Sequence, residues 1–66
     1  MPKYYYASVI NGEQKGLLMG PFDTHDEAEA AVPEAKRLAA KADSWAHLYS
    51  YGTAGSDELL PVVFPH

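Results

Sequence analysis

Hydrophobic and polar positions alternate along two segments of the chain, Lys3–Ile10 and Trp45–Tyr51. Alternation with a period of two is typical of β-strands that bury one face, and tyrosine, valine and isoleucine favour such strands. Between these segments, apolar residues recur at the spacing of an α-helix that starts at Thr24 and ends before Asp43-Ser44. The apolar stripe of this predicted helix is mostly alanine and comprises Ala28, Ala31, Val32, Ala35, Leu38, Ala39 and Ala42.

A hairpin turn is predicted directly after the first strand. Asn11-Gly12 stands there, and both residues tolerate the positive φ that a two-residue turn requires. This turn pairs Ile10 with Glu13 and gives a second strand that ends at Gly20-Pro21. The chain therefore begins with two antiparallel strands.

The predicted helix has complementary ends. Thr24 can accept a hydrogen bond from a free N–H group of the first turn, and Glu27 can reach back to the Thr24 amide. Acidic residues fall in the first turns and basic residues in the last, as the helix dipole favours. Pro33 removes one backbone hydrogen bond and predicts a kink, with two shorter helices as the alternative.

The C-terminal part gives a weaker pattern. Gly52–Glu58 is predicted to be a turn-rich loop. Leu59–Phe64 is apolar but contains Pro61, which confines it to a sheet edge or removes it from the sheet. A right-handed crossover places the third strand beside the first. The expected fold is a single α+β domain (1–66) of order β-β-α-β(-β). It is a small two-layer sandwich with a three- to four-stranded antiparallel sheet (order 2-1-3-4) and one helix on one face.

Alternation along the predicted strands sorts their side chains into two faces. The small, aliphatic face, to which Ala46 and Leu48 belong, suits the alanine-rich helix, so the aromatic face is left open. We expect this open face to bind a partner. Replacing Tyr6 and Tyr49 with serine is then expected to abolish binding and leave the fold intact. The candidate binding residues are Tyr4, Tyr6, Leu17, Met19, Trp45, His47, Tyr49 and Tyr51.

Three interpretations of the aromatic face stay open. In the first, Leu59–Phe64 folds back over it and completes the core of a small domain. In the second, the face is a protein interface, either with another protein or in a homodimer, because tyrosine, tryptophan and methionine are enriched at interface cores. In the third, it stacks on sugars or on the bases of single-stranded nucleic acid.

The charge argues against duplex nucleic acid as a partner, because the chain has five Lys and Arg residues and a net charge of -4. A further alternative is an acidic decoy that mimics nucleic acid. The acidic strip of such a decoy would comprise Asp23, Asp26, Glu27, Glu29 and Glu34.

Composition excludes several kinds of site. The chain has no cysteine, which excludes disulfides and thiolate metal sites. His25, His47 and His66 are isolated in the sequence, so we expect no metal and no cofactor. No residues form a nucleophile elbow or an ordered triad, and we therefore expect no enzymatic activity. The chain has neither a signal-peptide pattern nor an apolar run of membrane-spanning length, which predicts a cytoplasmic protein without membrane contact.

Two resemblances accompany these patterns. Gly20-Pro21-Phe22-Asp23-Thr24, followed by Asp26-Glu27-Ala28-Glu29-Ala30, resembles the strand-to-helix junction of SPOR domains, which bind peptidoglycan glycan strands. The resemblance is confined to this junction, and glycan binding is not carried over from it. In size and composition the chain also resembles small accessory or inhibitory proteins of phages and prophages. The sequence thus predicts a small, phage-like, non-enzymatic protein–protein interaction module.

Overall fold

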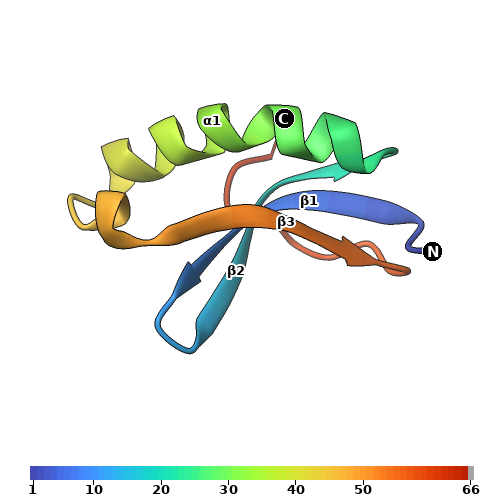
Figure 1. Ribbon diagram of the computed structural model, residues 1–66, viewed down its shortest axis with the longest axis horizontal. Coiled ribbons are helices and arrows are strands. Elements are labelled where there is room, and N and C mark those ends of the chain that lie inside the picture. The colour runs from blue at the N-terminus through green and yellow to red at the C-terminus, as the bar shows by residue number, and fades with distance from the viewer. Residues whose placement is uncertain (66) are drawn as a thin grey trace.

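One α-helix lies across one face of a three-stranded antiparallel sheet in the computed structural model, which describes residues 1–65 (Figure 1). The sheet has the order β2-β1-β3. The α+β class and the strand order 2-1-3 are therefore confirmed, whereas residues 59–64 form no fourth strand. The elements are β1 (Tyr4–Asn11), β2 (Gln14–Phe22), α1 (His25–Ala42), the 3-10 helix η1 (Ala46–Leu48) and β3 (Ser50–Ser56).

The hairpin between β1 and β2 turns one residue later than the sequence predicts. Asn11 pairs with Gln14 and Ile10 with Lys15, so the turn residues are Gly12 and Glu13. The predicted turn at Asn11-Gly12 needs positive φ at both residues. Among residues 1–65 only glycines take positive φ, with Gly12 at 64°. Asn11 stays extended at the end of β1, and the register moves by two positions.

The third strand lies later in the chain than predicted: of the predicted strand over residues 45–51 only Ser50 and Tyr51 belong to β3, and of the predicted loop over residues 52–58 only Asp57 and Glu58 lie outside it. The chain after α1 instead makes a turn and the 3-10 helix, and β3 occupies Ser50–Ser56. β3 pairs with β1 from Tyr4↔Ser56 to Ile10↔Ser50. β3 contains two glycines and two serines, which are typical of loops, and for this reason the sequence pattern predicts a loop there. Backbone pairing with the well-patterned β1 compensates for its weak strand propensity.

A single helix passes through Pro33, which confirms one continuous helix and excludes the two-helix alternative. The Thr24 hydroxyl accepts a hydrogen bond from the Glu27 amide at 3.1 Å, as predicted. The Glu27 carboxylate accepts a hydrogen bond from the same hydroxyl, also at 3.1 Å, and not from the Thr24 amide. Alanines 28, 35 and 39 are the buried residues of α1, and their small side chains let the helix lie close to the sheet.

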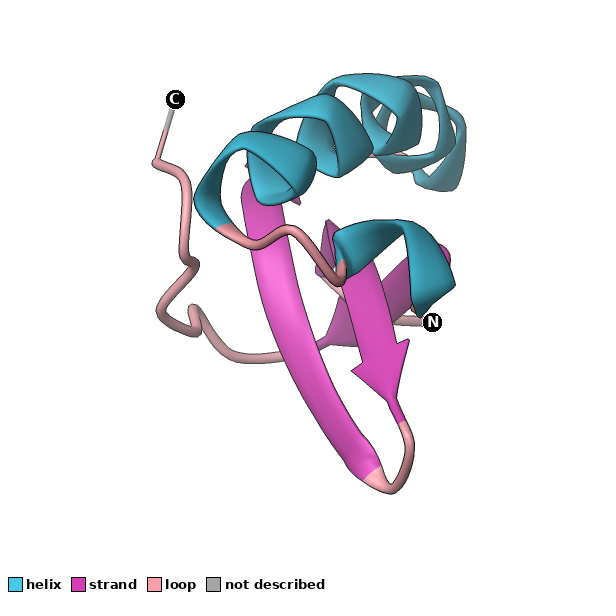
Figure 2. Cartoon of the chain, turned by 90° about the vertical axis from the view of Figure 1, so that its left-hand side faces the viewer, coloured by secondary structure: helices cyan, strands magenta, loops and turns pink. Residues whose placement is uncertain are grey.

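The segment after β3 wraps around the β2 side of the sheet (Figure 2). It first passes the face opposite α1, where the fully buried Tyr6 contacts it through hydrogen bonds. It then follows β2, and the amides of Val63 and Phe64 donate to the carbonyls of Leu17 and Leu18 at 3.0 and 2.8 Å. Phe64 packs against the core between α1 and the sheet. No helix among the described residues is long and apolar enough to cross a membrane.

Candidate functional site

The eight residues predicted to share one open aromatic face do not form one surface. Tyr6 is fully buried on the side of the sheet away from α1. Tyr4 and Leu17 are half-buried, and Leu17 accepts a backbone hydrogen bond from the C-terminal segment. Met19, Tyr49 and Tyr51 pack against the core beneath α1. Trp45 and His47 are exposed at one end of the molecule. The eight residues therefore do not form the single open face that the sequence predicts.

Register explains why Met19 and Tyr51 lie on the helix side. Directly opposed residues of neighbouring strands share a face. Tyr51 is opposite Val9, and Val9 belongs to the face that packs under α1. An irregularity between Ala7 and Ser8 shifts the β1–β2 pairing so that Met19 is opposite the buried Ala7. Counting alternate residues from sequence alone could not include either effect.

The connection between α1 and β3 is held by its own hydrogen bonds. The Asp43 carboxylate accepts two of them, from the Trp45 amide at 2.9 Å and from the Tyr49 hydroxyl at 2.7 Å. The Tyr51 hydroxyl donates to the carbonyl of Ala46 at 2.6 Å. Ala46 is buried in the core and anchors the middle of the turn. These contacts tie the turn to both the end of the helix and the start of β3.

Electrostatics reinforce this arrangement. The hydrogen bond from the Tyr49 hydroxyl, with that from the Trp45 amide, holds the pKa of the Asp43 carboxyl below its usual value of 3.8. The same bond to Asp43 raises the pKa of Tyr49 above its usual value of 10.0. Loss of water around Tyr51, followed by the charge of Asp43, raises the pKa of Tyr51 as well. At neutral pH the turn therefore contains a charged acceptor and neutral donors.

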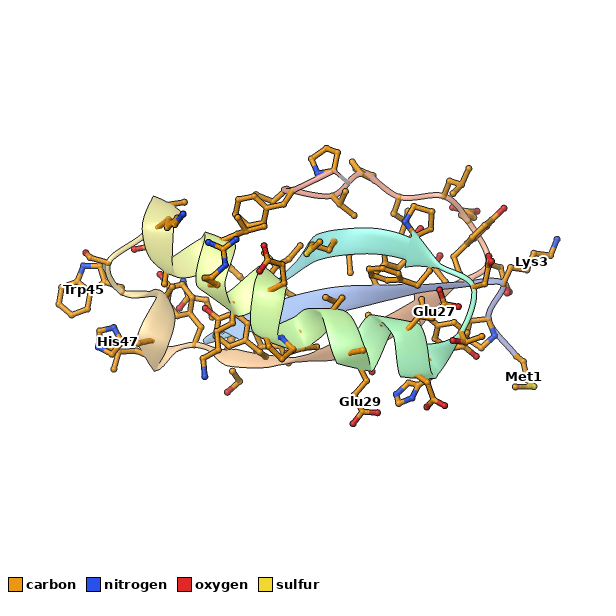
Figure 3. The ribbon with its side chains drawn as sticks, turned by 90° about the horizontal axis from the view of Figure 1, so that it is seen from above. Met1, Lys3, Glu27, Glu29, Trp45 and His47 are labelled. Carbon is orange, nitrogen blue, oxygen red and sulfur yellow. The ribbon has the colours of Figure 1, made fainter. Side chains whose placement is uncertain are left out.

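This turn presents three large side chains to solvent: Trp45, His47 and Leu48, which we call the η1 tip. Trp45 is 64% exposed and Leu48 is 65% exposed. Figure 3 shows Trp45 and His47 projecting from the end of the molecule, away from the helix and the sheet. The His47 ring is fixed by a contact of 3.0 Å between Nδ1 and the carbonyl of Ser44. The η1 tip is an exposed apolar group on an ordered support.

No family model, curated protein or solved structure matches this chain. The geometry of the η1 tip and of the other surfaces is therefore the evidence that bears on function.

One cluster of possible metal ligands lies at the start of α1. Ligand atoms of His25, Asp26 and Glu29 lie within 4.8 Å of one another, and all three residues are exposed. His25 Nδ1 is 4.0 Å from the Asp26 carboxylate and 3.7 Å from the Glu29 carboxylate. Its Nε2 is 3.0 Å from the Thr53 hydroxyl. Acidic residues stabilise the first turns of a helix without any ion, so these contacts are sufficiently explained by the helix end.

Sequence reasoning found two residues of the η1 tip, Trp45 and His47, and missed Leu48. Alternation assigned Leu48 to the helix-covered face, but in η1 it points to solvent. Asp43 was the available signal, because aspartate side chains commonly bond to backbone amides two residues on and start turns. That signal marks residues 43–49 as a turn rather than a strand.

Proposed function

We propose that this protein is a non-enzymatic protein-binding module that contacts its partner through the η1 tip. The observation that supports the proposal is an exposed tryptophan on a hydrogen-bonded turn. Tryptophan is among the residues that contribute most to protein interfaces. A turn that is already ordered loses little conformational entropy when it binds. The closely spaced hydrogen bonds of Asp43 and Tyr51 supply that order.

The tip suits an apolar pocket on another protein. Trp45 and Leu48 together offer an indole ring and a branched aliphatic side chain, and both are mostly exposed. The indole N–H has no hydrogen-bond partner among the described residues, so it is free to donate to a partner. Single-stranded nucleic acid remains the runner-up occupant, but base stacking normally accompanies a basic groove. The chain has five Lys and Arg residues against nine Asp and Glu residues, which favours a protein partner.

Affinity capture with the wild-type chain and with tip variants tests the proposal. Trp45→Ala and Leu48→Ser should each remove the captured partner, whereas Leu59→Ser should retain it. Leu59 is the matched control, because it is 66% exposed against 65% for Leu48 but lies on the C-terminal segment. Circular dichroism of each variant confirms that the fold is retained. Capture that is unchanged by both tip variants would contradict the proposal.

Trp45 is the only tryptophan of the chain and so reports directly on the tip. Binding of a purified partner should move its fluorescence emission to shorter wavelength, because the exposed indole becomes buried. Titration with a single-stranded oligonucleotide at two salt concentrations separates the runner-up. Emission that responds to the oligonucleotide at low salt and recovers at high salt would favour nucleic acid over protein.

A further inference from the structure

A groove of about 160 Å³ lies between the end of α1, the sheet and the C-terminal segment. Small and aliphatic side chains line it, among them Leu18 of β2 and Ala39 and Ala42 of α1. The polar residues of its lining are Asp43 and Tyr49, whose side chains are hydrogen-bonded to each other. Water in such a groove finds few hydrogen-bond partners, so an apolar group that displaces it gains binding free energy.

The groove adjoins the η1 tip, because both are built from the turn between α1 and β3. Asp43 and Ala46 line the groove. Trp45 and Leu48, from the same turn, are exposed at the end of the molecule. A partner that contacts the tip therefore has the groove next to it.

The wall of the groove on the side of the C-terminal segment is held in place. Phe64 packs against the core, and its amide donates to the carbonyl of Leu18 at 2.8 Å. Val63 also lines the groove and is mostly exposed, so it adds apolar surface at the rim. A site that is already formed loses little conformational entropy on binding.

Asp43 places a negative charge at this apolar site. The hydrogen bonds from the Tyr49 hydroxyl and the Trp45 amide lower the pKa of its carboxyl group, so it is charged at neutral pH. The ion pairs within residues 1–65 lie elsewhere on α1, and none includes Asp43. Lys41 lies in the last turn of the helix but forms no ion pair with it. The negative end of the helix dipole lies at the same place and also favours a cation.

We propose that the partner of the η1 tip inserts an apolar side chain into this groove and places a lysine or arginine against the Asp43 carboxylate. The inference rests on the proposed function, because it describes the partner of the same turn. Each carboxylate oxygen accepts one hydrogen bond within the chain and can accept a second, so both can receive a donor from a cation. A phosphate group would be repelled by the same charge, which favours a basic protein segment over nucleic acid.

The first test uses three small probes that share an apolar part and differ in charge: 4-phenylbutylamine, 4-phenylbutanol and 4-phenylbutanoate. Two-dimensional NMR of the labelled chain should show shifts of the Ala42 and Phe64 amides on titration with the amine. The amine should bind more tightly than the alcohol by about two- to fivefold, the range of an exposed ion pair. The butanoate should bind more weakly than the alcohol. This comparison is made on wild type and needs no variant.

Three variants assign the binding to the groove and to Asp43. Ala42→Leu fills the groove and should weaken the amine by about fivefold or more. Ala40→Leu is the matched control, because Ala40 is exposed on the same helix and does not line the groove. Asp43→Asn should make the affinities of the amine and the alcohol equal. Circular dichroism of each variant confirms that the fold is retained.

A second test addresses the partner directly. Random displayed peptides are selected on wild type after depletion on Ala42→Leu. The retained peptides should be enriched in lysine or arginine beside an apolar residue. Retained peptides without basic residues, or no retained peptide, would overturn the proposal.

The outcomes separate this inference from the proposed function. Capture that is lost with Trp45→Ala and Leu48→Ser, while no probe shifts the groove amides, would overturn the inference and leave the proposed function standing. Probes that bind the groove with the expected charge preference, while capture is unchanged by the tip variants, support the groove and its ligand chemistry and contradict the role of the tip. Equal affinity of wild type for the amine and the alcohol, or equal weakening by Ala42→Leu and Ala40→Leu, would also overturn the inference.

Discussion

Replacing Tyr6 with phenylalanine measures how far the C-terminal segment depends on one hydroxyl group. The Tyr6 side chain is fully buried. Its hydroxyl donates to the carbonyl of Glu58 at 3.1 Å and accepts from the amide of Leu60 at 3.0 Å. The substitution keeps the ring and leaves both backbone groups without this partner. A buried polar group left unpaired costs about 1–3 kcal/mol.

The expected loss lies in the lower part of that range. Leu60 is 38% exposed, so water can replace part of the lost hydrogen bonding. We therefore expect the free energy of unfolding to fall by about 1–2 kcal/mol. Domains of this size lose about 4–8 °C in Tm per kcal/mol, which gives a decrease of about 5–15 °C in thermal unfolding followed by circular dichroism. Amide exchange at Leu60 and Val63 should accelerate as well.

Tyr4→Phe is the control for this experiment. Tyr4 is half-buried on the same strand, and its hydroxyl makes no hydrogen bond within the described part of the chain. Its removal should leave Tm nearly unchanged. Equal unfolding temperatures for Tyr6→Phe and Tyr4→Phe, or unchanged exchange at Leu60, would show that the Tyr6 hydroxyl does not hold the C-terminal segment.

Three further predictions concern Gly20 near the end of β2, Thr24 at the start of α1 and Asp43 at its end. Gly20→Ala should lower the free energy of unfolding by more than about 2 kcal/mol in urea titration, because Gly20 has φ 142° and a Cβ there would lie 2.5 Å from Tyr6 Cδ1. A variant as stable as wild type would disprove this. Thr24→Ala should lower the free energy of unfolding, measured in the same way, by about 1 kcal/mol, because the helix cap is lost. Thr24→Ser should recover most of this stability, because serine keeps the hydroxyl. The pKa of Asp43 is lowered in the folded chain, so its contribution to stability is present above its usual value of 3.8 and is lost as pH falls below it; tryptophan fluorescence should report this loss. Asp43→Asn should abolish that acid transition and return the pKa of Tyr49 toward 10.0, measured by NMR of the tyrosine ring carbons, and a Tyr49 pKa that stays raised would contradict the assigned hydrogen bond.

The helix and the first hairpin could be predicted because their signals are local. Thr24 and Glu27 mark the helix start within one turn, and the alanine stripe continues in phase across Pro33. β1 has strong alternation and β-favouring residues. Even here, the register depended on which residue took positive φ, and the structure assigns that conformation to Gly12 and not to Asn11. Composition alone could not predict this shift of two positions in the pairing of β1 with β2.

A third strand beside the first was predicted, but its residues could not be, because its formation depends on β1 rather than on its own residues. Ser50–Ser56 has little intrinsic strand propensity, and it becomes a strand by pairing with seven positions of β1. The preceding residues alternate as a strand does, yet Asp43 and Ala46 make them a turn. Local pattern and long-range pairing disagree here, and the long-range pairing decides.

The tyrosines show why an aromatic-rich sequence misplaced the candidate site. A tyrosine has a polar hydroxyl as well as an apolar ring, so it can form a hydrogen bond to another part of the chain as well as line a surface. Three of the five do so here: Tyr6 holds the C-terminal segment, Tyr49 holds Asp43, and Tyr51 holds the carbonyl of Ala46. Serine at Tyr6 would remove a fully buried ring, at about 3–5 kcal/mol, from a domain of marginal stability. The double change of Tyr6 and Tyr49 to serine, expected from sequence to spare the fold, would therefore unfold it. Trp45 has no such internal bond from its ring and is mostly exposed, and for that reason it is the aromatic residue whose place in the structure is best explained by a partner.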